Sequence, residues 1–152
     1  MNLAGRLLGT LIIATGVSSI AAAQKNPYRT YTEEKFVQNM QSASRNYGAV
    51  ASFIGKSDYE PAKAQLTRAR EQLAITVQYW RDVNKPDAVT MLREALKRMD
   101  DLDAALSKTP VDPAALRDVS TRINTACEAC HRVYREQDPA TKAYRVKSGS
   151  IR

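Results

Sequence analysis

Apolar side chains recur at steps of three and four residues in four segments of the chain, which is the spacing of one face of an α-helix. We therefore predict helices over residues 33–54, 58–82, 87–106 and 113–135. The clearest stripe, in the first segment, comprises Phe36, Met40, Ala43, Tyr47, Val50 and Ile54. Strand-like alternation is absent from the sequence. Four amphipathic helices joined by short loops predict an all-α fold, an antiparallel up-down-up-down four-helix bundle.

Residues 1–23 have the features of a secretory signal peptide. They contain an early Arg6, an apolar run and an Ala-Ala-Ala cleavage site. Gly9 and Gly16 interrupt the apolar run, which is short for a transmembrane helix. We predict export to the periplasm with cleavage, and no stable membrane insertion afterwards. An uncleaved N-terminal anchor is the alternative.

The chain after the signal peptide divides into a helical domain and a tail. Residues 24–136 contain the four predicted helices and form the bundle domain. Residues 137–152 are polar and basic, and they follow the last helix. We predict that this C-terminal tail is mobile unless Tyr144 and Val146 hold it against the bundle.

The chain is basic, with 23 Lys and Arg residues against 16 Asp and Glu and a formal net charge of +7. Its basic residues are spread out and form no dense block with interleaved aromatics, so the composition argues against a nucleic-acid-binding protein. A mild positive excess attracts acidic partner proteins and makes the encounter sensitive to salt. A solvated basic surface without such a role is the simpler interpretation.

Both cysteines and the only histidine fall within five consecutive residues, as Cys127, Cys130 and His131. C-x-x-C-H is the attachment motif of c-type haem. Two thiols about one helical turn apart can each form a thioether to a vinyl group of the same porphyrin, and the adjacent imidazole can then bind the iron. The motif predicts one covalent haem c and its iron, with His131 as the proximal ligand.

Three other interpretations fit these residues less well. A disulfide between residues three apart would close a tiny loop and remove little entropy from the unfolded chain. A redox-active dithiol commonly begins a helix next to a strand, whereas this pair lies deep within a predicted helix. Zinc needs a fourth ligand, and no second Cys or His motif supplies one.

The position of the motif on the last helix of an exported bundle resembles the class II c-type cytochromes, the cytochrome c prime family. The similarity covers residues from about 31 to 136. It includes an aromatic residue three positions and a basic residue four positions after the histidine, Tyr134 and Arg135. Arg135 lies one turn beyond His131, where it can bind a haem propionate or stay solvated. The tail has no counterpart in the shorter members of the family.

The resemblance leaves two possibilities for the sixth iron ligand. Low-spin members supply a methionine from the first helix, and Met40 with Gly48 eight residues later is similar to them. Open-site members usually carry an arginine in this stretch, and residues 37–39 contain none. A small register shift would place Gln41 at the distal face instead, so the open site stays possible. Gly48 inside a predicted helix has two interpretations: a close approach of the helix to the haem or to a neighbouring helix, or a neutral position without such a role. Met40 as a core filler is the alternative to ligation.

We expect an extracytoplasmic cytochrome that carries single electrons, with His131 and Met40 as axial ligands, and that is not an enzyme. The alternative is a five-coordinate haem protein that binds nitric oxide or carbon monoxide at an open distal site. Peroxidase chemistry would lack a distal histidine, since the chain has only one. The resemblance also implies homodimers, formed through the first two helices in similar proteins, but the sequence does not decide this.

Overall fold

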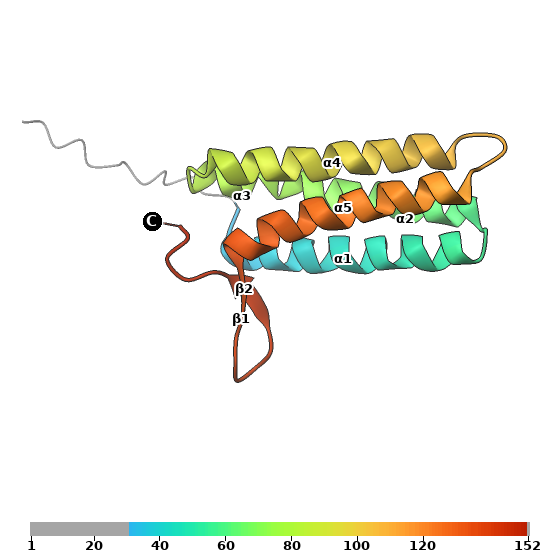
Figure 1. Ribbon diagram of the computed structural model, residues 1–152. Coiled ribbons are helices and arrows are strands. Elements are labelled where there is room, and N and C mark those ends of the chain that lie inside the picture. The colour runs from blue at the N-terminus through green and yellow to red at the C-terminus, as the bar shows by residue number, and fades with distance from the viewer. Residues whose placement is uncertain (1–30, 152) are drawn as a thin grey trace, which may run out of the picture.

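The structure, a computed structural model, describes residues 31–151 and consists mostly of helices (Figure 1). In chain order the elements are α1 (Glu33–Gly55), α2 (Tyr59–Ile75), α3 (Val77–Asp82), α4 (Pro86–Leu106), α5 (Pro113–Tyr134), β1 (Arg135–Gln137) and β2 (Tyr144–Val146). The helical character of the prediction is confirmed, and two three-residue strands are the exception. The predicted signal peptide over residues 1–23 lies outside the described residues. None of the helices within residues 31–151 is long and apolar enough to cross a membrane.

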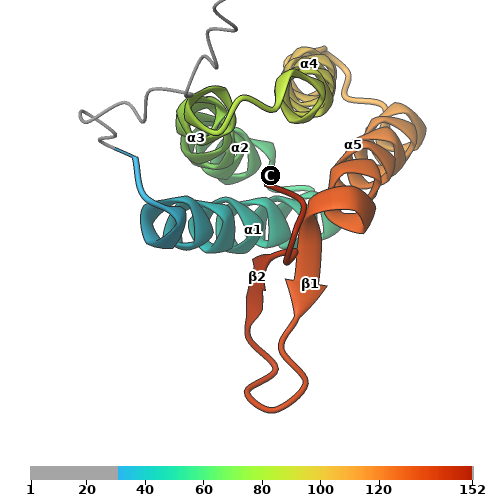
Figure 2. The same cartoon turned by 90° about the vertical axis from the view of Figure 1, so that its left-hand side faces the viewer.

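The long helices α1, α2, α4 and α5 lie side by side, and each runs opposite to the one before it (Figures 1 and 2). Their backbones approach most closely between α1 and α2 and between α4 and α5, and to a lesser extent between α2 and α4. The backbones of α1 and α5 make few close approaches. This separation leaves room between α1 and α5 for the cavity described below.

Local chemistry explains where α1 and α5 begin. Thr32 precedes α1, and its hydroxyl accepts a hydrogen bond from the backbone N–H of Lys35 at 3.2 Å. Asp112 precedes α5, and its carboxylate accepts a hydrogen bond from the backbone N–H of Ala114 at 2.8 Å. Pro113 occupies the first position of α5, where a backbone N–H would have no acceptor within the helix, so its absence costs nothing. Both starting points match the prediction.

The segment predicted as one helix over residues 58–82 is broken at Thr76, which separates α2 from α3. The buried Thr76 hydroxyl donates a hydrogen bond to the carbonyl of Leu73 at 2.6 Å. A threonine that bonds back along its own helix competes with the backbone pattern and bends the helix. The short helix that follows contributes Tyr79 and Trp80 to the core, each 1% exposed.

The chain beyond α5 forms a β-hairpin where a mobile tail was predicted (Figures 1 and 2). Strands β1 and β2 pair in antiparallel fashion, with Arg135 opposite Val146. The Asp138 carboxylate stabilises the connecting turn by accepting hydrogen bonds from the backbone N–H groups of Ala140 and Thr141, at 3.0 and 2.8 Å. The fourth helix therefore ends one residue before its predicted end.

Two ion pairs and one buried side chain hold the hairpin. The Arg145 guanidinium lies 2.7 Å from the Glu136 carboxylate and 3.3 Å from that of Asp138. Val146 is buried in the core, whereas Tyr144 is 49% exposed. Of the two side chains expected to hold this segment against the bundle, only Val146 is buried there.

Candidate functional site

The two cysteines lie in the C-terminal half of α5. Cys127 and Cys130 are both half-buried, and neither forms a disulfide. Burial raises the pKa of both thiols, to about 11 for Cys130. A redox-active dithiol needs a lowered thiol pKa, so this environment disfavours the dithiol interpretation.

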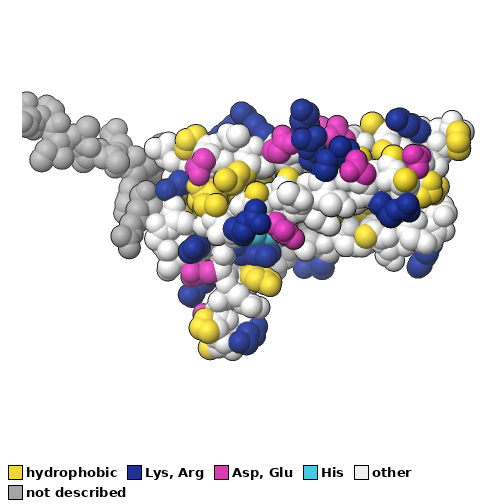
Figure 3. Space-filling view, viewed as in Figure 1, with side chains coloured by type: hydrophobic (Ala, Val, Ile, Leu, Met, Phe, Trp, Pro, Cys, Tyr) yellow, Lys and Arg dark blue, Asp and Glu magenta, His cyan; other side chains and the backbone are white. Residues whose placement is uncertain are grey.

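The imidazole of His131 is half-buried beside the cysteines. Burial lowers its pKa to about 4, and the positive charge of Arg135 adds to this effect. The ring is therefore neutral at neutral pH, which is the form that binds metal ions. In Figure 3 the histidine (cyan) lies beside Lys and Arg side chains near the base of the hairpin. Because the imidazole of His131 is already neutral, it could bind iron without first losing a proton.

A cavity of about 510 Å³ opens between α1 and α5. Cys127, Cys130 and His131 line it from α5, and Met40 lines it from α1. Its apolar walls include Phe36, Val37, Leu73, Trp80, Leu92 and Met99. The volume lies within the range of pockets that enclose organic ligands. The structure thus brings together the residues predicted to hold the haem and its iron.

Met40 reaches the cavity from the helix opposite the cysteine motif. It is half-buried and packs against the core as well as lining the cavity, so its position is compatible with both predicted roles. Its neighbour Gln41 lines the same cavity. Met99 of α4, which is 2% exposed, is a second thioether in the wall. It lies on the core stripe of α4, so the sequence pattern gave no signal that it belonged to a site.

Gly48 is not a point of close helix packing. A Cβ atom added at this position would meet nothing within 4 Å, and the residue is exposed. Among the alternatives for Gly48, the close approach to a neighbouring helix is therefore wrong. The preceding residue, Tyr47, does line the cavity, and its hydroxyl donates a hydrogen bond to the carbonyl of Ser120 at 3.3 Å. That bond links α1 directly to α5.

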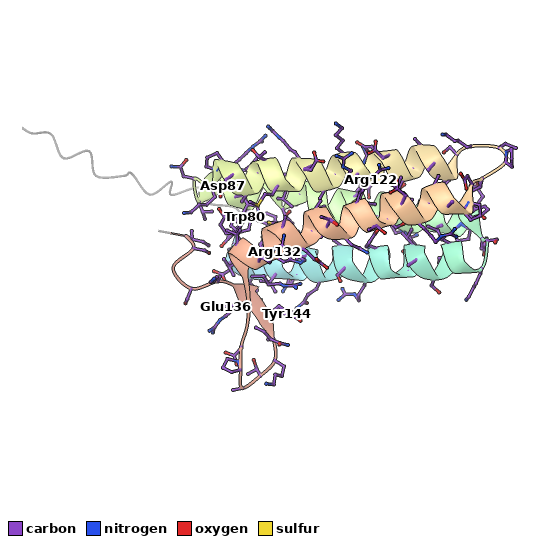
Figure 4. The ribbon with its side chains drawn as sticks, viewed as in Figure 1. Trp80, Asp87, Arg122, Arg132, Glu136 and Tyr144 are labelled. Carbon is purple, nitrogen blue, oxygen red and sulfur yellow. The ribbon has the colours of Figure 1, made fainter. Side chains whose placement is uncertain are left out.

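Aromatic rings form the wall of the cavity near α3. The rings of Trp80 and Tyr134 pack with their centres 4.6 Å apart. The Tyr134 hydroxyl donates a hydrogen bond to the carboxylate of Asp87, which lowers the pKa of that carboxyl. Figure 4 labels Trp80 and Asp87 at this end of the molecule. The buried indole N–H of Trp80 has no hydrogen-bond partner within residues 31–151, so the wall contains an unused donor.

The hairpin forms a further wall of the cavity. Tyr144, Arg145 and Val146 line it from β2, together with Arg135 at the start of β1. The guanidinium carbon of Arg135 lies 4.4 Å from the centre of the Tyr144 ring. Arg135 thus reaches the predicted site, but the three β2 residues were not predicted to line it. Three-residue strands are too short to produce a recognisable alternation in the sequence.

The groups around the cavity fit a c-type haem. Two thiols one turn apart match covalent attachment, and a neutral imidazole with a thioether across the cavity matches axial ligation of the iron. Cys127, Cys130, His131 and Met40 would hold the group. Within residues 31–151 no three or more His, Cys, Asp and Glu side chains gather to hold a metal ion, so the zinc interpretation gains no further ligand there.

Comparisons of the chain with protein-family models, with curated proteins and with solved structures found no match. The resemblance to class II cytochromes therefore depends on the C-x-x-C-H motif, the two residues that follow it and the predicted bundle.

Proposed function

We propose that this protein is an extracytoplasmic monohaem c-type cytochrome that carries single electrons. The proposed fold is an antiparallel up-down-up-down four-helix bundle, similar to the low-spin class II cytochromes. The observation that carries the proposal is that Cys127, Cys130, His131 and Met40 line one largely apolar cavity between two helices. Export to the periplasm is inferred from the sequence of residues 1–23.

The haem, when bound, supplies a one-electron couple between ferrous and ferric iron. Cys127 and Cys130 would hold the group through two thioethers, which would retain it in an open compartment. His131 offers a neutral imidazole from α5, and Met40 offers its thioether from α1. A thioether paired with an imidazole raises the reduction potential. The apolar side chains of the walls would pack against the porphyrin.

A second candidate function is the binding of nitric oxide or carbon monoxide at an open iron face. The observation that favours it is that Gln41, next to Met40, lines the same cavity. A small shift of α1 would bring this amide to the distal side in place of the thioether. His131 would then be the only axial ligand from the protein.

Attachment of haem is tested with the whole chain, produced in a host that matures c-type cytochromes. We expect coloured protein whose mass is raised by one covalently bound haem. The double variant Cys127→Ala with Cys130→Ala should lack the added mass, because both thioether positions are gone. Colourless wild-type protein of unchanged mass would contradict the proposal.

The spin state of the oxidised haem separates the carrier from the gas-binding protein. We expect low-spin iron in the wild type and high-spin iron in Met40→Ala, measured by absorption and EPR. Met91→Ala is the matched control, because Met91 is half-buried in α4 and packs on the core but does not line the cavity. It should stay low-spin. High-spin iron in the wild type, with ready carbon monoxide binding when reduced, would favour the open site.

We propose that the redox partners are acidic proteins, because the chain has a formal net charge of +7. In Figure 3 Lys and Arg side chains lie beside the histidine, close to where electrons would enter or leave. A homodimer formed through α1 and α2 is implied by the family resemblance alone. Sedimentation of the haem-loaded protein would test it.

A further inference from the structure

The hairpin wall of the cavity contains a cation, Arg135, that forms no ion pair with the residues that the structure describes. Arg145 is paired with Glu136 and Asp138, at 2.7 and 3.3 Å. The Arg135 guanidinium instead lies over the ring of Tyr144, 4.4 Å from the ring centre. A guanidinium in this position is attracted by the negative face of the ring.

The hairpin fixes the Tyr144 ring relative to α5. Arg135 pairs with Val146 across the two strands, and Val146 is buried in the core. The backbone N–H of Lys147 donates a hydrogen bond at 2.8 Å to the carbonyl of Tyr134, the last residue of α5. Figure 4 shows Tyr144 on the hairpin below the end of α5. The ring therefore keeps the guanidinium beside the cavity, which both residues line.

We propose that Tyr144 is a positioning residue that holds the Arg135 guanidinium at the cavity, ready to bind a propionate of the haem. This inference depends on the proposed haem. The two propionates are the ionised groups at the haem edge, and a guanidinium binds a carboxylate with two parallel hydrogen bonds. A cation near the porphyrin disfavours the extra positive charge of ferric iron, so it shifts the equilibrium toward the reduced form. The hairpin would thus tune the reduction potential from outside the iron ligands.

Two substitutions of Tyr144 in the haem-loaded protein separate the aromatic face from the bulk of the side chain. Tyr144→Phe keeps the face and loses only the hydroxyl, whereas Tyr144→Leu keeps apolar bulk and loses the face. We expect Tyr144→Leu to shift the ratio of oxidised to reduced protein about two- to fivefold toward the oxidised form. Tyr144→Phe should match the wild type, and Arg135→Gln should shift the ratio in the same direction by at least as much as Tyr144→Leu. The measurement is a redox titration followed by absorption.

The double variant shows whether Tyr144 acts through Arg135. If it does, Arg135→Gln with Tyr144→Leu has the same ratio as Arg135→Gln alone, because the ring has nothing left to position. Additive shifts would overturn the proposal, since Tyr144 would then act through hairpin packing. The proposal would also be overturned if Tyr144→Leu behaved as wild type, or if Tyr144→Phe shifted the ratio as far as Tyr144→Leu.

Failure of the proposed function would look different, because protein without covalent haem gives no such redox titration. The stacking can then be measured directly by NMR. Ring currents should shift the side-chain protons of Arg135 in the wild type and in Tyr144→Phe, and the shift should vanish in Tyr144→Leu. Unshifted Arg135 protons in the wild type would overturn the positioning role, with or without haem.

Discussion

The two ends of the helical assembly are packed with different kinds of side chain. At the end where α5 finishes, the ring of Tyr79 stacks on Phe36 with their centres 4.5 Å apart. Trp80 meets both of these rings edge-on at 5.1 Å and packs on Tyr134 at 4.6 Å. At the opposite end the core is aliphatic, and its buried side chains include Val50, Ala62, Leu66, Leu102 and Leu116. We call these the aromatic end and the aliphatic end.

The difference gives a physical reason for the position of the cavity. Small and branched aliphatic side chains interdigitate and fill the space between helices at high density. Large rigid rings keep contact with one another but adapt less to the space beside them. The cavity, walled in part by Phe36, Trp80 and Tyr134, lies at the aromatic end. We infer that the aliphatic end mainly supplies stability and that the aromatic end supplies the site.

The largest expected effect on stability comes from a truncation at the aliphatic end. Leu116 is fully buried near the start of α5, so Leu116→Ala should lower the free energy of unfolding by about 2–5 kcal/mol. Leu92→Ala is the matched control, because Leu92 is also buried but faces the cavity. In protein produced without haem, Leu92→Ala should lower the free energy of unfolding by less than Leu116→Ala does. Urea unfolding measures both values. If both substitutions lowered the free energy of unfolding equally, the distinction between the aliphatic and aromatic ends would be wrong.

A second effect should appear at alkaline pH, where Tyr47 joins α1 to α5. Burial raises the pKa of Tyr47 to about 12 from its ordinary value of 10. Because the folded-state pKa is the higher one, this contribution to stability is complete below pH 10 and is lost as the pH rises toward 12. The loss is about 1–2 kcal/mol because Tyr47 is partly exposed, and Tyr47→Phe should lose less stability than the wild type by about this amount. Unfolding by urea at pH 8 and at pH 12 measures the difference, and parallel losses in the two proteins would contradict the assigned cause.

The boundaries of the main helices could be predicted because each helix carries its own local signals. Asp112 and Pro113 mark the start of α5 regardless of what α5 packs against. The break at Thr76 could not be predicted, since its hydroxyl turns back to a backbone carbonyl in a buried setting that only the tertiary structure creates. The hairpin could not be predicted either. Its ion pair between Arg145 and Glu136 joins residues that come together only when the chain turns between them.

Some residues of the candidate site could likewise be predicted from the sequence, and others could not. That Cys127, Cys130 and His131 lie together at one site was predictable, because the three residues fall within about one helical turn. The place of Met40 on the inner stripe of the first helix was also predictable, and it lines the cavity. The contribution of Met99 was not, because a methionine on a core stripe looks the same whether it faces a neighbour or a cavity. Sequence periodicity indicates the buried face of a helix but not what fills the space next to it.

Gly48→Ala is expected to increase stability. Gly48 is exposed and belongs to the core of neither the aromatic end nor the aliphatic end. Gly48 lies in the interior of α1, and an added methyl group would meet nothing within 4 Å. The main change is the lower conformational entropy of the unfolded chain, so the free energy of unfolding should rise by about 0.5–1 kcal/mol. Gly55→Ala, at the last residue of α1, also has space and should gain less. A change in the haem spectrum of Gly48→Ala would show that Gly48 does belong to the site.

The smallest expected effect concerns the outer surface of α5, where the two ends can be compared by charge. Arg132 and Arg122 are both exposed on α5, about 15 Å apart along the helix axis (Figure 4). Arg132 is next to His131, whereas Arg122 is paired with Asp118 at 3.0 Å, farther from the motif. If an acidic partner docks near the haem, Arg132→Glu should slow electron transfer about two- to threefold more than Arg122→Glu at low salt.

Salt provides the control for this last prediction, because exposed charges are screened within about 3 Å at 1 M ionic strength. The difference between the two variants should therefore disappear in stopped-flow measurements at high salt, while their haem spectra stay the same. A difference that persists at high salt would indicate that Arg132 contributes through packing. Equal slowing by both variants at low salt would mean that the partner responds to the net charge of the whole protein and does not distinguish the aromatic end from the rest of α5.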